Sequence, residues 1–263
     1  MITDATDGVK RAVHHASDSP VIEWGARLGY AANGLIHLLL AWLTLQIAVG
    51  GSSEQASQSG ALAEVAQQPW GKALLWPVAA GFALLALWQV TEVVTRRETS
   101  DKAKAGAQAV VYLALATTAF RFASGGSTSS NKQTKDFTLT VMNWPGGRLI
   151  VAAIGLGILG VAGYHVYKGW TKKFLADLRG QPGAWAVNAG RMGYILKGAA
   201  LAAVGVLFVV AAVRRQGNRA TGLDGALRAL RDLPAGTVLL VLIAIGLAAY
   251  GAYSFTRARY ARV

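Results

Sequence analysis

The chain repeats one block three times, and this repeat limits what it can fold into more than any other feature. Each copy begins with a proline, has a glycine two residues later and a second glycine ten residues after that, and then an aromatic residue. The three sets are Pro69, Gly71, Gly81 and Trp88; Pro145, Gly147, Gly157 and Tyr164; and Pro234, Gly236, Gly246 and Tyr253. A fixed internal period indicates copies of one structural unit packed against each other. The chain is therefore predicted to contain three equivalent units.

The residues around each block form apolar runs that are long enough to cross a bilayer. A helix of roughly 20 apolar residues spans the ~30 Å hydrocarbon core. Hydrophobic residues make up 53% of the chain and charged residues 15%, and six runs are present, at about 28–49, 72–94, 106–123, 148–168, 194–213 and 236–256. The run at 106–123 is the least apolar, because it contains Gln108 and Arg121. We predict an all-α integral membrane protein with six transmembrane helices.

These helices are expected to form three tandem hairpins of the same orientation. The first helices also repeat, since ARLGYAANG at 26–34 matches GRMGYILKG at 190–198, whereas the second unit keeps only a loose GAQAVVY and lacks the arginine. An even number of spans per unit gives a parallel repeat and not an inverted one. The predicted parts are a polar tail at 1–20 and units at 21–100, 101–180 and 181–263. The repeated Gly81, Gly157 and Gly246 are expected at close helix contacts, where small residues let membrane helices approach.

A short amphipathic stretch precedes each proline, at about 61–68, 137–144 and 224–233. In the third stretch Leu223, Leu227 and Leu230 fall on one helical face. Stretches of this length cannot span the membrane, so we predict interfacial helices on the outer surface with the apolar face in the headgroup region. The following proline ends each helix.

The net charge of +13 is distributed around the apolar runs. This favours membrane-flanking charge over a nucleic-acid surface, which needs a basic soluble face. Fifteen lysines and arginines fall on the side that holds both termini and ten on the other, with Lys197 inside a helix. The positive-inside rule then places both termini in the cytoplasm. The basic linker residues Lys172, Lys173 and Arg179 are candidates for contact with anionic lipid or with a protein partner.

Two arginine–tyrosine pairs, Arg27 with Tyr30 and Arg191 with Tyr194, each lie on one helical face. The simpler interpretation is anchoring at the membrane interface, where arginine snorkels and tyrosine lies at headgroup level. The alternative is a site for a phosphate headgroup or an anionic partner, bound by the forked donors of arginine.

The sequence offers no constellation for catalysis, a metal or a cofactor. Cysteine is absent, and no phosphate-binding loop, zinc-ligand spacing, Ser–His–Asp set or carboxylate pair is present. His37 and His165 invite a haem interpretation. However, His37 is expected about 16 Å from its helix end and His165 near the end of another helix, so their depths differ. We expect each histidine to form an interhelical hydrogen bond instead.

The segments RLGYAANG, GALAEVAQQPWGK, YHVYKGWTKKFLADL, GRMGYILKG, LDGALRALRDLPAG and YGAYSFTRARY resemble an uncharacterised bacterial membrane-protein family. That family has many actinobacterial members, is catalogued only as a domain of unknown function, and consists of three tandem two-helix units. The resemblance covers about residues 24–260 and implies fold and membrane location, but no activity.

We therefore expect a non-enzymatic scaffold or accessory subunit that binds a membrane partner or anionic lipid. The alternative is a transport protein for a small solute or ion along the pseudo-threefold axis. A continuous line of inward polar residues would favour transport, and an axis filled by Leu, Val and Ala would favour the scaffold.

Overall fold

The computed structural model describes residues 20–51, 55–95, 98–180 and 182–261, and these residues are helical apart from loops and one isolated bridge between Leu178 and Ala261. The polar tail predicted at 1–20 lies outside the described residues, except for its last residue. The long helices are α2 (Pro20–Ala48), α4 (Gly71–Thr95), α5 (Thr99–Ala123), α7 (Gly147–Trp170), α8 (Ala184–Arg214) and α10 (Gly236–Tyr260). The short ones are α3 (Gln58–Gln67), α6 (Ser130–Met142) and α9 (Gly222–Arg231), with 3-10 turns η1 (Lys173–Asp177) and η2 (Gly217–Arg219).

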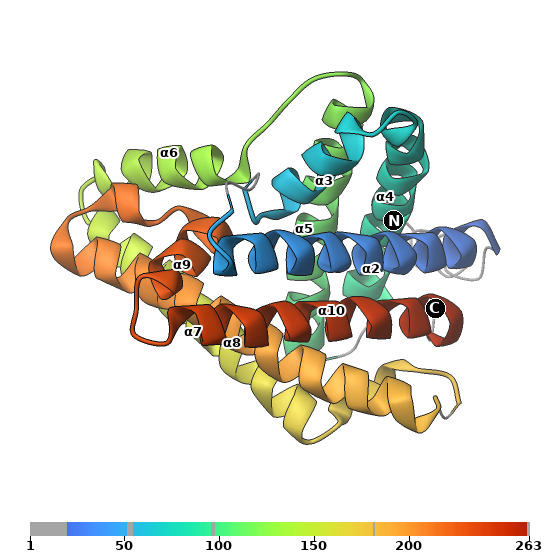
Figure 1. Cartoon of the computed structure of the whole chain (residues 1–263). Helices are drawn as coiled ribbons and strands as arrows, with labels where there is room; N and C mark the ends of the chain where they lie inside the picture. The colour runs from blue at the N-terminus through green and yellow to red at the C-terminus, as the bar shows by residue number, and fades with distance from the viewer. Residues whose placement is uncertain (1–19, 52–54, 96–97, 181, 262–263) are drawn as a thin grey trace, which may run out of the picture.

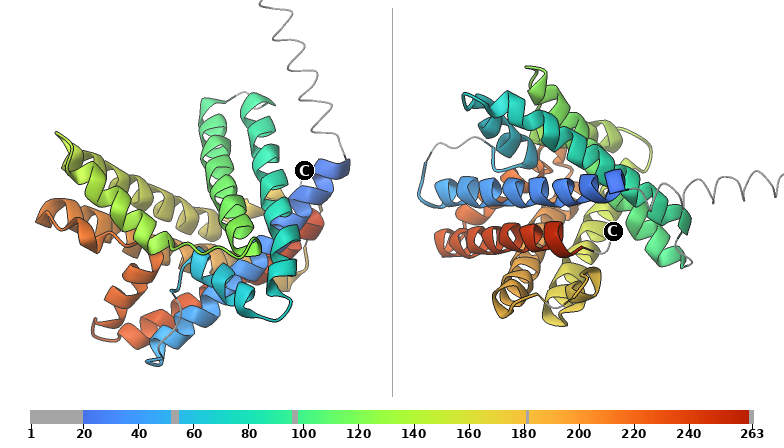
Figure 2. Two further views of the ribbon diagram at one scale, coloured as in Figure 1. Left: turned by 90° about the horizontal axis from the view of Figure 1, so that it is seen from above. Right: turned by 90° about the vertical axis from the view of Figure 1, so that its right-hand side faces the viewer.

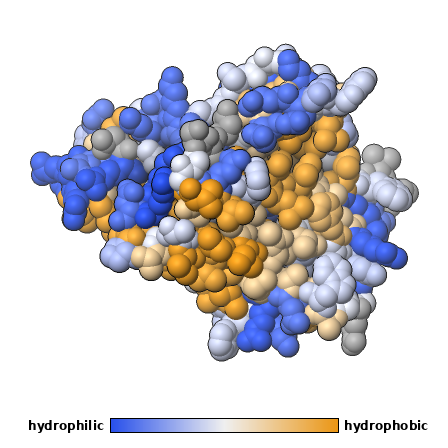
Figure 3. Space-filling model, viewed as in Figure 1, coloured by the Kyte–Doolittle hydropathy of each residue, from blue (hydrophilic) through white to orange (hydrophobic). Residues whose placement is uncertain are grey.

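Five of the long helices are long and apolar enough to cross a membrane: α2 from Glu23 onward, α4, α7, α8 and α10. The sixth predicted run lies in α5, which does not reach that standard. Its charged first turns and the internal Gln108 and Arg121 lower its hydropathy. On the face shown in Figure 3, apolar residues occupy the middle of the molecule and hydrophilic residues lie towards its edges.

The most extensive helix pairs join neighbouring units. α4 packs along α5, α7 along α8, and α10 along α2 (Figure 1), so the second helix of each unit meets the first helix of the next, and the last meets the first. The hairpins expected within units are weaker: α2 contacts α4 and α8 contacts α10 less extensively, and α5 makes no extensive contact with α7. The contacts of the six long helices therefore form an open series, α5–α4–α2–α10–α8–α7, in which the first helix α2 and the last helix α10 lie in the middle.

The three pairs cross each other instead of standing upright side by side. In Figure 1 the α4–α5 pair runs across the direction of α2 and α10. Figure 2 shows the pairs pointing away from a common centre in different directions. The α10–α2 pair contacts both other pairs, through α2 with α4 and through α10 with α8, and the α4–α5 and α7–α8 pairs make no extensive contact with each other.

Small residues form equivalent contacts in these pairs. A Cβ atom at Gly34 of α2 would lie 3.0 Å from the carbonyl oxygen of Gly251 in α10, and one at Gly198 of α8 would lie 2.8 Å from that of Ala162 in α7. Gly34 matches Gly198 in the sequence repeat, so two of the three pairs use the same contact. Such close approach supplies van der Waals contact where the lipid gives no hydrophobic drive between helices.

The repeated proline-to-glycine element has one structural role in all three units. A Cβ at Gly71, Gly147 or Gly236 would collide with the carbonyl oxygen of Val65, Val141 or Leu230 respectively. These carbonyls belong to the last turn of the preceding short helix in each unit. Only glycine leaves room for a chain that leaves a short helix and starts a long one within a few residues.

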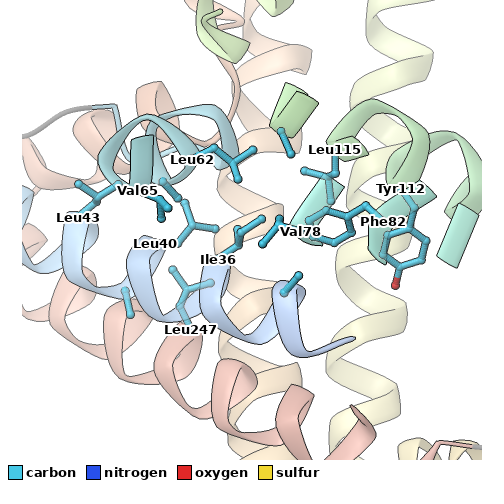
Figure 4. Close-up of a cluster of buried hydrophobic side chains, with 14 of the residues drawn as sticks. Ile36, Leu40, Leu43, Leu62, Val65, Val78, Phe82, Tyr112, Leu115 and Leu247 are labelled. Carbon is cyan, nitrogen blue, oxygen red and sulfur yellow. The ribbon is translucent and has the colours of Figure 1, made fainter. Parts of the chain in front are cut away.

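The short helices α3, α6 and α9 lie next to one another at one end of the long helices, the short-helix end. The apolar faces of α3 and α9 are not open to lipid: Leu62 and Val65 of α3 are buried, and Leu227 of α9 is 0% exposed. They pack on the α2 and α10 core shown in Figure 4. Exposed apolar side chains remain near α6, at Phe137 and Trp144. The predicted burial of these faces in the headgroup region therefore differs from the structure of α3 and α9, whose leucines fill the protein core.

One buried carboxylate joins the three units at this end. Asp224 of α9 accepts hydrogen bonds from the backbone N–H of Ala56 at 2.9 Å and from Asn131 Nδ2 at 2.8 Å. It also accepts from Arg228 Nε at 3.0 Å, which forms an ion pair within α9. Asp224 therefore links the start of α3, the start of α6 and α9 itself.

The three repeated glycines predicted at close contacts do not behave alike. A Cβ at Gly81 would lie 3.0 Å from the Gly29 nitrogen, and one at Gly246 would collide with Leu196, so both lie at helix crossings. Gly157 has no atom within 4 Å of its Cβ position. The expectation is wrong for Gly157, because α5 does not cover this part of α7.

Candidate functional site

A cluster of aromatic rings lies where α8 and α10 meet the turn η1, near the end of the long helices opposite the short-helix end (the terminal end). Phe174 stacks on Tyr194 with ring centroids 5.4 Å apart and meets Tyr253 edge-on at 5.1 Å. Tyr194 meets Tyr250 edge-on at 5.2 Å, and the Tyr253 hydroxyl donates to the Phe174 carbonyl at 3.1 Å. We call these four residues the tyrosine cluster. Offset and edge-to-face contacts of this kind add stabilisation beyond the buried area.

Cationic side chains lie against tyrosine rings around this cluster. Arg257 lies 4.2 Å from the Tyr30 ring centroid, and its Nη2 donates to the Tyr30 hydroxyl at 3.2 Å. Lys168 Nζ lies 5.4 Å from the Tyr194 centroid. A third contact places Lys197 Nζ at 3.8 Å from the Tyr250 centroid. Desolvated contacts between a cation and a ring face are worth up to about 2 kcal/mol.

Two of these contacts occur at the same position of the sequence repeat. Arg257 and Lys168 occupy matching places in their units, as do Tyr30 and Tyr194, so the α10–α2 and α7–α8 pairs share one cation–tyrosine contact. Lys168 also donates to Asp177 Oδ2 at 2.6 Å. Arg257 has no such carboxylate among the described ion pairs, and its buried Nε has no hydrogen-bond partner there.

The histidines bond within their own helices. His37 Nδ1 lies 2.8 Å from the Asn33 carbonyl oxygen, and His165 Nδ1 lies 2.9 Å from that of Val161. Because a carbonyl oxygen only accepts, Nδ1 is the donor in both. The expected interhelical histidine bonds are therefore wrong. The bond between α2 and α10 at this level comes from Asn33 Nδ2, which donates to Ser254 Oγ at 3.2 Å.

Towards the short-helix end the interior between α2 and α10 changes from polar to apolar. Its fully buried side chains there are leucines and isoleucines, joined by a leucine of α9: Leu40, Leu43, Ile47, Leu227 and Leu240. The buried Thr44 donates to the Leu40 carbonyl of its own helix. We call this group the apolar plug. It separates the polar half of the interior from the short-helix end.

The predicted arginine–tyrosine pairs are split between surface and core. Tyr30 is 3% exposed and Tyr194 4%, so both tyrosines belong to the protein interior and not to the headgroup level. Arg27 forms an ion pair with Glu23 at 2.7 Å and donates to the Arg259 carbonyl at 2.9 Å. Arg191 instead lies over the ring of Trp170, with its guanidinium carbon 5.2 Å from the ring centroid.

A shallow surface depression of about 650 Å³ lies beside Arg191 along α8. It is lined by Trp185, Asn188, Ala189, Arg191, Met192, Ile195 and Leu196. Within the described residues no group of three or more histidine, aspartate or glutamate side chains is placed to hold a metal ion.

The basic linker after α7 does not line the depression and contacts the start of α2 instead. Lys173 Nζ lies 4.7 Å from the Tyr167 ring centroid, and Lys172 adopts a left-handed conformation with φ 57°. Arg179 Nη1 lies 3.6 Å from Glu23 Oε1, so this linker is tied to the start of α2.

Sequence reasoning missed the roles of Arg257, Glu23 and Asp224. For Arg257 a signal was present, because the cation repeats at the same place as Lys168 while the tyrosines of the neighbouring helices also repeat. Nothing in the local sequence indicated Asp224 as a link between units, since its partners lie far away in the chain.

Comparison with known proteins identifies the repeat. The family described as Domain of Unknown Function (DUF1206) matches three segments, residues 28–96, 103–172 and 192–261. An uncharacterized protein of Bacillus subtilis strain 168, YxxB, is 28% identical over 255 residues, which cover 92% of each chain. No solved structure matches the chain. The chain belongs to the DUF1206 family and is an integral membrane protein that carries three tandem copies of its domain.

Proposed function

We propose that this protein is a non-enzymatic membrane scaffold or accessory subunit that holds a transmembrane helix of another protein against α7. The observation that carries the proposal is the uncovered face of α7. In the first and third units the helix that follows the proline is crossed by the first helix of the same unit, at Gly81 and Gly246. The matching Gly157 of α7 has no neighbour.

The uncovered face continues along α7. Gly160 and Gly163 also have nothing within 4 Å of their Cβ positions, and Leu156, one turn before Gly160, is 61% exposed. Among the five apolar spans α7 is the least buried, with 17% of its apolar window inside the protein, compared with 56% for α10. A face of glycines with a flanking leucine suits close packing of another membrane helix.

The apolar plug is the reason that a scaffold is proposed ahead of a conduit. The polar side chains Asn33, His37 and Ser254 lie in the half of the interior near the terminal end, and the buried Thr44 of the other half is bonded to its own helix. Between them and the short-helix end the interior between α2 and α10 is filled by Leu40, Leu43 and their neighbours. A permeation pathway needs continuous polar or hydrated lining.

Our topology proposal adds α5 as a sixth span in a bacterial plasma membrane with both termini cytoplasmic. The support is the basic bias towards that side and the even number of helices between the ends. Because the chain has no cysteine, Ser100→Cys and Ser127→Cys give single reporters. A membrane-impermeant thiol reagent applied to intact cells should label position 127 and spare position 100. The reverse labelling would invert the topology and leave the helix contacts unchanged.

Partner docking is tested by placing a photo-crosslinking residue at Leu156 in cells that produce the full chain. The matched control is the same residue at Leu242, an exposed apolar position of α10. We expect an adduct with a second polypeptide from position 156 only, and we expect Gly160→Leu to remove it by filling the face. Adducts of equal yield from both positions, or none from position 156, would contradict a docking role for α7.

A further inference from the structure

The two arginine–tyrosine elements differ in whether their arginine is neutralised. Arg27 has Glu23 at 2.7 Å, one turn earlier in the same helix. Arg191 is the matching residue of the third unit, but Val187 stands where the first unit has Glu23. No carboxylate forms an ion pair with Arg191 within the described part of the chain. Arg191 is therefore the one of these two arginines whose charge remains available for an anion.

The guanidinium of Arg191 is held at the edge of the α8 depression. Trp170, the last residue of α7, lies under it at 5.2 Å from ring centroid to guanidinium carbon. A guanidinium over an indole ring is held there by cation–π attraction, and its N–H groups can still donate a bidentate contact to phosphate. Trp170 and Trp185 are both exposed, and indole rings of this kind lie at the headgroup level of membranes.

The depression is mostly apolar, with two polar residues among those that line it. Asn188 and Arg191 lie in the first turns of α8, beside the apolar Trp185 and Ala189, whereas the lining further along the helix, Met192, Ile195 and Leu196, is wholly apolar. α8 enters the membrane from the linker that precedes Ala184, so this change follows the direction from headgroup to hydrocarbon. A phospholipid has the same order of chemistry, whereas free phosphate would leave the apolar part of the depression empty.

We propose that the α8 depression is a binding site for an anionic phospholipid. Arg191 binds the phosphate, Asn188 and the indole N–H of Trp185 supply further donors, and one acyl chain lies along Met192, Ile195 and Leu196. The site is specific to the third unit, because Glu23 already pairs with the arginine of the first unit. This assignment does not depend on partner docking at α7.

The test uses the purified full chain in mild detergent and native mass spectrometry to count bound lipid. Dioctanoyl phosphatidylglycerol is the probe, and dioctanoyl phosphatidylcholine is the zwitterionic comparison, which carries a phosphate but no net charge. Arg191→Gln should weaken phosphatidylglycerol binding about tenfold, the effect of losing one charged hydrogen-bonding group. Arg27→Gln is the matched control and should leave binding unchanged. Arg191→Lys should give an intermediate loss, because lysine keeps the charge and lacks the fork.

Three results would overturn the assignment. Equal weakening by Arg27→Gln and Arg191→Gln would show general surface charge and no site. Equal binding of the two lipids to the unmodified protein would show that charge is not recognised. Competition by millimolar inorganic phosphate would show a site for the free anion. Because thermal melting of each variant is measured alongside, Arg191→Lys decides the outcome if Arg191→Gln fails to fold.

Discussion

The second unit differs from the first and third at one crossing point. In the first unit α2 passes α4 at Gly29, where a Cβ would lie 2.7 Å from the Gly81 carbonyl oxygen. In the third unit α8 passes α10 at Gly193, where a Cβ would lie 2.6 Å from the Tyr250 backbone. Gly29 and Gly193 are each the second residue of their family segment, because those segments begin at residues 28 and 192. The segment of the second unit begins at residue 103, so the matching residue there is Lys104. A long cationic side chain cannot occupy a backbone contact, so α5 and α7 stay apart.

Contacts elsewhere support this register. Gly106 of α5 lies against Val93 of α4, and Gly169 of α7 lies against Ile195 of α8. Gly106 and Ile195 are both the fourth residue of their family segments, which begin at 103 and 192. Val93 and Gly169 also match, since each lies twelve residues after the repeated glycine of its helix, Gly81 or Gly157. Lys104 itself forms an ion pair with Asp101 at 3.0 Å and lies 5.6 Å from the Tyr164 ring centroid. The repeat thus keeps the helix pairing between units in all three pairs and loses the crossing within a unit only where glycine is replaced.

The largest effect is expected for Gly193→Leu, which would force a side chain into the backbone of α10. We expect a loss of about 3 kcal/mol in the free energy of unfolding, the upper range for overpacking. Gly157→Leu is the matched control and should change it by less than about 0.5 kcal/mol, as for other exposed sites. Thermal melting in detergent checks both. Equal losses would show that Gly157 is covered after all.

Asp224→Ala tests the short-helix end, where the Asp224 carboxylate joins the three units. The Ala56 N–H and Asn131 Nδ2 would lose their acceptor, and each unpaired buried group costs about 1–3 kcal/mol. We expect a destabilisation of about 2 kcal/mol. Since Asn131 connects the second unit to Asp224, protease cleavage between α5 and α6 should increase. Unchanged melting and cleavage would mean that water replaces the carboxylate without loss.

Gly251→Ala compares two contacts between units. The α7–α8 pair already has Ala162 where the α10–α2 pair has Gly251, and a Cβ at Gly251 would lie 2.9 Å from the Gly34 carbonyl oxygen. We expect a loss of about 1 kcal/mol, the lower range for overpacking. A variant that melts at the unchanged temperature would show that α10 and α2 can separate as far as α7 and α8.

The smallest energetic effect, and the most direct test of the opening comparison, is expected for Lys104→Gly. The exposed pair with Asp101 contributes less than about 1 kcal/mol, and glycine adds a similar helix cost. With Ala107→Cys and Gly157→Cys present, removal of the lysine should raise the yield of a disulfide between α5 and α7. These positions correspond to Leu196 and Gly246, which touch in the third unit. An unchanged yield would show that another feature separates the helices.

Local and periodic features of this protein could be predicted from its sequence. The apolar length of each run predicts a membrane helix, and five of the six runs meet that standard in the structure. The Pro69-to-Gly71 spacing and its two copies mark the turn from a short helix into a long one. These features depend on residues a few positions apart, so no knowledge of the packing is needed to find them.

Only the tertiary structure decided how the helices pair and which side chains are buried. Apolar length says nothing about partners, because lipid and protein are equally apolar surroundings for a leucine, and the choice then depends on the shape of close contacts. Gly34 meets Gly251, and Arg257 meets Tyr30, across more than two hundred residues of chain. The burial of Tyr30 follows from those distant meetings, whereas the ion pair of Arg27 with Glu23 is a local contact, one turn apart in α2.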